Sequence, residues 1–299
     1  MTAQTIERSI TAFLDGEDSI EIDNIIHSTE GAAKFGFSGA LVGGVTVYSW
    51  AVPALIEALG EEWLDSGWID FRLRRPVYPG DEITTRVVSS PPAPRGGVAE
   101  ASHSLPPLGG DAEGRGGTLT VEFTMAKESG EICIAGAAGL GEAEFTRDLA
   151  VTRNRDPVAA ADPPTLLTPE NLPIGEDLPA MSVPMSTEDA EVYADQFARD
   201  PHTRWRGEGA RLHPGWIAGR CVRLTKHTYH YPAGIHAGSQ IQMLAPARAG
   251  QTLVVSGHVT DGYRRKEHEY CLLDVTISDE SGEDIARLRH RTIYQVGGG

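Results

Sequence analysis

A long apolar stretch near the N-terminus dominates the pattern of hydrophobic and polar positions. Between Leu41 and Leu59, apolar side chains recur at intervals of three and four residues, the period of an α-helix, and the opposite side is scarcely more polar. A helix that is apolar on nearly all sides is a buried one. Pro53 lies inside the run and removes one backbone donor, so we expect a kink or a break there. The rest of this half is expected to pack around that helix.

Strand patterns follow the helix. The alternation of apolar and polar residues at 69–73 has the period of a β-strand, and a turn at 79–81 leads to a strand at 83–88, which we interpret as its hairpin partner. Residues 89–117 are rich in proline and glycine and are expected to form a mobile loop. Two further strands are predicted, at residues 118–126 and 132–140. One buried helix wrapped by an antiparallel sheet is an α+β arrangement.

The second half repeats this pattern in weaker form after a proline-rich crossing. Ser186 is an N-cap candidate for a short helix, and a longer helix-like run starts at His213. Corresponding helix starts and turns in the two halves lie about 170 to 175 residues apart, which indicates an internal duplication. Four strand patterns follow the second helix, at residues 235–244, 252–259, 269–278 and 285–294. We therefore expect a domain at 1–145, a linker at 146–185 and a degenerate second domain at 186–299.

Composition and charge narrow the function classes. The 299 residues carry a formal net charge of −16, which disfavours nucleic acid and anionic membranes as partners, because both attract basic surfaces. The three cysteines form no Cys-x-x-Cys pair and the N-terminus lacks the apolar core of a signal peptide, so we expect a cytoplasmic protein with reduced thiols. The sequence contains no serine-hydrolase elbow, Walker loop, dinucleotide fingerprint or metal-ligand spacing.

Candidate chemistry lies just upstream of the apolar helix. His27 follows Asp23 and Asn24 and precedes Glu30, in a segment too short and broken to be a core helix. An imidazole beside carboxylates at the start of a buried helix could act as a general acid or base near neutral pH. A loop histidine that only caps or hydrogen-bonds its neighbours would give the same pattern. The residues alone leave both interpretations open.

Several short motifs, taken in order, resemble those of a known family. They are Asn24-Ile25-Ile26-His27, Ala33, Gly36-Phe37, Ala40-Leu41-Val42-Gly43-Gly44 and Arg74-Arg75-Pro76-Val77-Tyr78-Pro79-Gly80-Asp81. In order and spacing this set resembles the MaoC-like, or (R)-specific enoyl-CoA hydratase, family in its double hot dog form. The resemblance implies two antiparallel sheets, each wrapping a long central helix, packed as a pseudo-dimer within one chain. It also implies reversible addition of water to a 2-enoyl thioester of coenzyme A or of an acyl carrier protein, without a cofactor.

The resemblance suggests roles for individual residues. His27 would handle the proton or the water, oriented by Asn24 or by a nearby carboxylate. The thioester oxygen gains charge during the reaction and would be held by backbone N–H groups at Gly43 and Gly44, at the start of the central helix.

The chain departs from the family where the catalytic carboxylate is expected. That position holds Ile22, so we expect Asp23, one residue away, or Glu30 to replace it. This departure favours an alternative, a non-catalytic protein that binds an acyl thioester or stabilises a partner. A hot dog thioesterase is a further alternative, although Glu57 and Glu61 lie late in the helix.

Basic residues and the second half supply the remaining candidates. Arg264 and Arg265 are expected to bind the substrate, because coenzyme A requires cations near its phosphates, although an ordinary charged turn gives the same pattern. The same two interpretations apply to Arg72, Arg74 and Arg75. The second half lacks an Asn-x-x-His loop and is expected to be a structural partner, with His213 a candidate for facing a shared site. The chain could also pair as a homodimer.

Overall fold

The structure is a computed structural model that describes residues 5–14, 24–89 and 119–297. The candidate carboxylate Asp23 lies outside these residues. The loop predicted at 89–117 does so as well, apart from its first residue.

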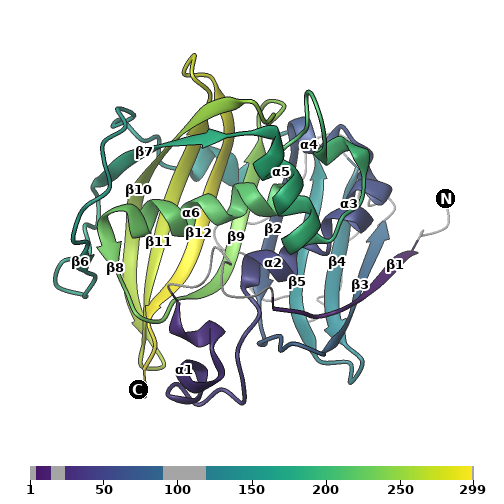
Figure 1. The fold of residues 1–299 in the computed structure, drawn as a ribbon, viewed down its shortest axis with the longest axis horizontal. Coiled ribbons are helices and arrows are strands. Elements are labelled where there is room, and N and C mark those ends of the chain that lie inside the picture. The colour runs from purple at the N-terminus through teal and green to yellow at the C-terminus, as the bar shows by residue number, and fades with distance from the viewer. Residues whose placement is uncertain (1–4, 15–23, 90–118, 298–299) are drawn as a thin grey trace, which may run out of the picture.

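One antiparallel sheet of ten strands runs through both halves of the chain (Figure 1). In spatial order its strands are β1 (Thr5–Thr11), β3 (Glu82–Ser89), β4 (Thr120–Lys127), β5 (Ile132–Leu140), β2 (Gly67–Leu73), β9 (Ile235–Met243), β12 (Asp284–Gln295), β11 (His268–Ser278), β10 (Gln251–Arg265) and β7 (Asp177–Met185). Strand β2 of the first half pairs with β9 of the second, with Phe71 opposite Ser239. The sheets of the two halves are therefore joined edge to edge.

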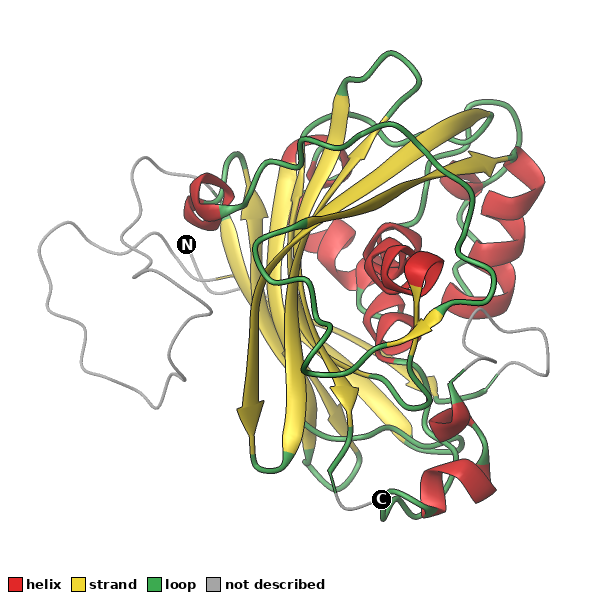
Figure 2. Ribbon diagram, turned by 90° about the vertical axis from the view of Figure 1, so that its left-hand side faces the viewer, coloured by secondary structure: helices red, strands yellow, loops and turns green. Residues whose placement is uncertain are grey.

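Two central helices lie on the concave side of the sheet (Figure 2). The first is divided into α2 (Gly44–Ser49) and α3 (Val52–Leu59), with Pro53 in the first turn of α3, so the predicted break is confirmed. The second is α6 (Pro214–Thr228), close to the predicted run. The shorter helices are α1 (Thr29–Ala33), α4 (Trp63–Ser66) and α5 (Thr187–Tyr193), and two short parallel strands are β6 (Thr165–Leu166) and β8 (Tyr229–His230). Ser186 caps α5 in a capping box with Asp189, as its sequence predicts.

Close packing explains why the first helix is apolar on all sides. Its residues Tyr48 and Leu55 are fully buried, and the ring of Tyr48 stacks on Phe71 of β2 at 4.5 Å between ring centres. On another side, α2 contacts α6 so closely that a Cβ atom at Gly215 would collide with Ser49 Oγ. Sheet and second helix together leave little of the first helix in contact with water.

The sheet corrects the predicted hairpin. Strands β2 and β3 are not partners, because β2 pairs with β5 and β9, whereas β3 pairs with β1 and β4. The alternation of residues identifies a strand, but the choice of neighbour depends on packing against the rest of the sheet. The segment between the two strands instead passes the start of α2 and, at residues 74–77, lines a cavity.

Two edge strands also differ from the predictions. Strand β1 has no counterpart among the predicted strands, and β7 lies inside the predicted linker at 146–185 and pairs with β10. Strand β7 contains Pro179 and Pro184, which interrupt the strand pattern in the sequence. Proline is tolerated there because an edge strand has one side without a partner. The division of the chain into two domains and a linker stays a prediction.

Candidate active site

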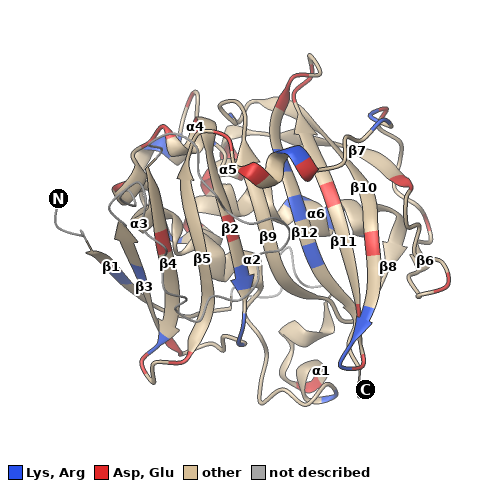
Figure 3. Cartoon of the chain, turned by 180° about the vertical axis from the view of Figure 1, so that it is seen from behind, with Lys and Arg blue, Asp and Glu red and all other residues tan. Residues whose placement is uncertain are grey.

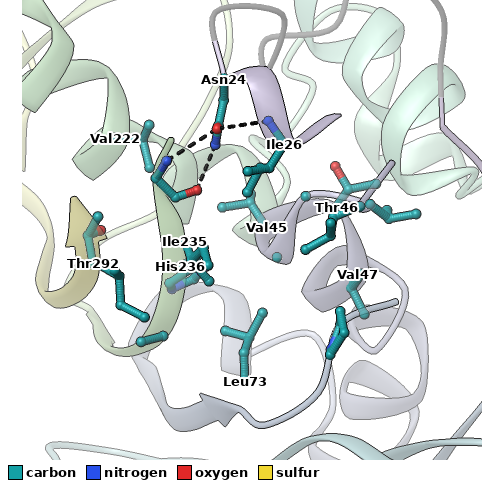
Figure 4. A pocket seen from close by; sticks show the side chains of 18 of the residues that line it. Asn24, Ile26, Val45, Thr46, Val47, Leu73, Val222, Ile235, His236 and Thr292 are labelled. Atoms are coloured by element: carbon teal, nitrogen blue, oxygen red, sulfur yellow. Dashed lines mark hydrogen bonds between the residues drawn. The ribbon is translucent and has the colours of Figure 1, made fainter. Parts of the chain in front are cut away.

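A cavity of about 540 Å³ lies where the two halves meet. Its walls come from the loop before α2, the first turn of α2, the segment after β2, helix α6 and the start of β9. Figure 4 shows side chains from both halves around it, among them Asn24, Val45, His236 and Thr292. Each half therefore contributes to one shared site.

His27 lies on the wall of this cavity, in a 3₁₀ turn at Ile25–His27. Its Nδ1 is 2.7 Å from the carbonyl oxygen of Leu41. A carbonyl oxygen only accepts, so Nδ1 carries the hydrogen and Nε2 is the basic nitrogen of the neutral imidazole. Leu41 is held in turn, because its N–H donates to the carbonyl of Ile26 at 2.9 Å. These bonds fix the ring beside the segment that leads into α2.

Asn24 joins the His27 loop to the second half of the chain. Its Nδ2 donates to the carbonyl of Gly234 at 2.6 Å, and its Oδ1 accepts from the N–H of Gly234 at 3.2 Å. The same oxygen caps the 3₁₀ turn through a longer bond of 3.5 Å from the N–H of Ile26. Figure 4 shows these three bonds as dashed lines. Asn24 therefore positions His27 by pairing with a distant backbone unit, which the sequence did not reveal.

The candidate carboxylates do not complete the site in the described residues. Glu30 has a side chain that is 90% exposed and lies 3.7 Å from Lys34, so it is not a wall residue. None of the described residues that line the cavity is Asp or Glu. Asp23 is adjacent in sequence to Asn24, and its role stays a prediction.

Gly43 and Gly44 both line the cavity, at the start of α2. A Cβ atom at Gly44 would collide with the tip of Leu73 and would lie 3.1 Å from the Cβ of His236. Glycine therefore allows α2 to approach strands β2 and β9 closely at this point. The expected role of the two residues in holding a thioester oxygen stays a prediction.

A buried pair of imidazoles was missed by the sequence analysis. His236 lines the cavity, and its Nε2 is 2.8 Å from Ser239 Oγ, which is 3.0 Å from Nδ1 of His290. Burial lowers the pKa of His236 to about 3, and burial followed by the proximity of His236 lowers the pKa of His290 well below its ordinary value. Both rings are therefore neutral at pH 7. The only signal in the sequence is a run of polar residues within an apolar strand.

The charged residues in the described part of the wall are all basic. They are Arg74, Arg75, Arg220, Lys226 and Lys266. The described wall residues therefore include five cations and no carboxylate, in a chain whose formal net charge is −16. Such a local surplus favours an anionic ligand.

Comparisons with known proteins agree on the fold. No family model matches the chain, and no curated protein matches it either. A MaoC domain protein from Chloroflexus aurantiacus is 12% identical, with a TM-score of 0.61 over 99% of this chain and 96% of its own. A Mycobacterium tuberculosis protein with a double hot dog fold is 16% identical, with a TM-score of 0.59 over 98% of this chain and 96% of its own. This chain has the double hot dog fold. A MaoC-like dehydratase is 16% identical, with a TM-score of 0.54 over 89% of this chain and 88% of its own.

The double hot dog structure places only some of the expected cations at the cavity. Arg264 and Arg265, at the end of β10, are not wall residues, and Arg264 lies 3.6 Å from Glu269 instead. The neighbouring Lys266 is a wall residue. Arg72 alternates with core residues of β2 and so faces the outer side of the sheet. On that outer side, basic residues also follow one another along β12 (Figure 3).

The other candidates lie away from the cavity. His213 caps α6, since its Nδ1 accepts from the N–H of Gly215 at 3.1 Å, and its ring is buried against Trp205 rather than in the cavity wall. Glu57 pairs with Arg8 at 2.7 Å, and Glu61 lies 3.3 Å from Arg204. Glu61 lies beyond the end of α3, in the turn before α4, and not in the helix as expected. Neither carboxylate is a wall residue, so the geometry does not support the thioesterase alternative.

The helices described here are too short or too polar to cross a membrane.

Proposed function

We propose that this double hot dog chain is a hydratase or dehydratase that adds water reversibly to a 2-enoyl thioester of coenzyme A or of an acyl carrier protein. The observation that carries the proposal is His27 on the cavity wall, with its Nδ1 hydrogen-bonded to the carbonyl of Leu41, which makes Nε2 the basic nitrogen of the neutral ring. The resemblance of the His27 motif to that of enoyl-CoA hydratases and the fold shared with MaoC-like dehydratases support the same reaction class.

His27 can carry both proton transfers of the reaction. In hydration, Nε2 takes a proton from water as the water oxygen bonds to C3 of the enoyl group. The π electrons shift to the thioester, whose oxygen gains negative charge, and backbone N–H groups at Gly43 and Gly44 would stabilise that charge. The protonated imidazole then returns the proton to C2, so that one water molecule has been added. Asn24 keeps the ring in place through its bonds to Gly234.

The charge of the wall supports a thioester of coenzyme A. Arg74, Arg75 and Lys266 are exposed residues of the cavity wall, where phosphates could reach them from solvent. The rest of the lining is mainly apolar, with residues such as Val45, Val47 and Ile235 that suit an acyl chain. This combination of cations and apolar surface fits a ligand with an anionic head and a short apolar arm.

Turnover of a panel of trans-2-enoyl-CoA and 3-hydroxyacyl-CoA thioesters tests the proposal. The wild type should convert at least one of them, and His27→Ala should lose at least about a hundredfold in kcat, the size expected for a general acid or base. The control is His230→Ala, which removes an exposed histidine that is not a wall residue. A wild type that converts every tested thioester as slowly as His27→Ala does would refute the proposal.

The second candidate is a binding protein without chemistry. The observation that favours it is the lack of a carboxylate among the described wall residues. Calorimetry with the same thioesters separates the two candidates, since tight binding without turnover would favour the second.

A further inference from the structure

Arg220 is a buried cation on the cavity wall. It lies on α6 and is only 6% exposed. Its Nε donates to the carbonyl of Trp216 at 3.1 Å, and its guanidinium carbon lies 3.9 Å from the centre of the Trp216 ring. In the part of the chain that the structure describes, no Asp or Glu pairs with it.

An arginine in this environment needs a counter-charge. Burial lowers the pKa of Arg220 to about 10, with a further contribution from the nearby Arg223, so the guanidinium is still protonated at pH 7. Charged side chains are rarely buried unless they are paired, because desolvation of an ion is costly. One ring face and one backbone carbonyl do not replace an anion. The missing partner is therefore expected to be a ligand in the cavity.

Arg220 is more deeply buried than the other basic residues of the wall. The exposed cations are Arg74, Arg75 and Lys266. Arg220 instead lies near Tyr193, whose ring stacks on that of Phe197 at 5.2 Å between ring centres, and both of these wall residues are buried. The preceding residue, Gly219, faces the first turn of α2, where an added Cβ would lie 3.7 Å from Val45. Arg220 therefore belongs to the interior part of the wall, close to the start of α2.

We propose that Arg220 binds a carboxylate at the far end of the acyl group, so that the thioester accepted by this site is that of a dicarboxylic acid. The inference rests on the proposed function in one respect, the position of the thioester near Gly43 and His27. With the coenzyme A phosphates held at the exposed cations, the acyl chain extends inward. A methyl terminus would leave Arg220 buried without an anion, whereas a carboxylate would accept two N–H bonds from the guanidinium.

Binding of a pair of saturated thioesters tests this proposal without any turnover. Succinyl-CoA and butyryl-CoA have acyl chains of equal length and differ in a terminal carboxylate or methyl group. By calorimetry, the wild type should bind succinyl-CoA about 10- to 100-fold more tightly, the range typical of a hydrogen-bonded ion pair. Arg220→Met should abolish this preference and leave the affinity for free coenzyme A unchanged.

Two controls separate binding from folding. Arg223→Met removes the same charge from the same helix at a residue outside the cavity wall and should keep the preference. Urea denaturation of Arg220→Met should give a midpoint equal to or above that of the wild type, because an unpaired buried charge has been replaced by an apolar side chain of similar length.

Three results would overturn the assignment. The first is equal affinity of the wild type for the two thioesters, and the second is a preference for succinyl-CoA that survives in Arg220→Met. The third is a loss of affinity for free coenzyme A in that variant as large as its loss for succinyl-CoA. The last result would assign Arg220 to the phosphates. Turnover of fumaryl-CoA and of crotonyl-CoA tests the hydratase proposal separately. If the protein prefers succinyl-CoA but converts neither enoyl thioester, the carboxylate site stands and the hydratase proposal is refuted.

Discussion

The bridge from Asn24 to Gly234 is expected to control the loop that carries His27. Asn24→Ala removes both hydrogen bonds to Gly234, with donor–acceptor distances of 2.6 and 3.2 Å. A typical net contribution of about 1 kcal/mol for each gives about 2 kcal/mol in total. The third bond of Asn24, at 3.5 Å, is at the limit of useful geometry and adds little. The form of the loop in which Asn24 is bonded to Gly234, the closed form, should therefore be destabilised by about 2 kcal/mol relative to an open form without these bonds. This corresponds to about a 30-fold change in the equilibrium between the two forms.

Amide hydrogen exchange at Leu41 measures that change directly. The N–H of Leu41 donates to Ile26 within the loop, at 2.9 Å, so it is protected only while the loop is closed. Exchange at Leu41 should be about 30-fold faster in Asn24→Ala if it proceeds by local opening. The matched control is Asn171→Ala, because Asn171 also bridges a backbone N–H and a carbonyl, at 2.8 Å each, but does so in an exposed turn outside the cavity wall.

Two outcomes would contradict this reasoning. Unchanged exchange at Leu41 in Asn24→Ala would show that the bridge does not hold the loop. Equally faster exchange in Asn171→Ala would show that the effect is a general loss of stability rather than the loss of this contact.

Two further predictions concern packing and pH. Gly44→Ala should destabilise the fold by about 1–2 kcal/mol in urea denaturation, since its Cβ would collide with the tip of Leu73 and lie 3.1 Å from the Cβ of His236. Gly219→Ala, whose nearest contact would lie at 3.7 Å, should not lower the stability, and equal losses in the two variants would refute the steric argument. The pKa values of His236 and His290 are lowered in the folded state, so below about pH 6.5 these two side chains take up protons only in the unfolded chain. Each of them then lowers the free energy of unfolding by up to about 1.4 kcal/mol per pH unit. The difference between the urea midpoints at pH 7.5 and 5.0 should therefore be smaller in His290→Gln than in the wild type, with His236 still contributing, and should be unchanged in His230→Gln, an exposed control. An equal difference in the two variants would contradict the linkage.

Local patterns in the sequence predicted most secondary structure correctly. The apolar helix, its break near Pro53, the cap at Ser186 and the strands of the second half depend on interactions within a few residues, which periodicity and residue type express directly. The motif around His27 likewise predicted the fold through its resemblance to a family, and the fold is confirmed.

The partners of those elements could not be predicted in this way. The pairing of β2 with β9 and the bridge from Asn24 to Gly234 join residues more than 150 positions apart, and no local pattern encodes such contacts. Strand β7 was missed because its prolines are acceptable only at a sheet edge, and only the folded sheet has an edge.

The same distinction applies to the candidate site. The sequence by itself determined most of the elements and singled out His27, because its place in a short polar segment before a helix and the motif around it are local features. Only the tertiary structure decided that Lys266 rather than Arg264 reaches the cavity and that His236 lies in its wall. It also decided that Arg220 is buried there with no Asp or Glu of the described residues paired with it. The burial of a charged group and the groups beside it depend on segments that folding brings together from both halves. The free energy of burying or pairing that charge therefore cannot be read from the order of residues along the chain.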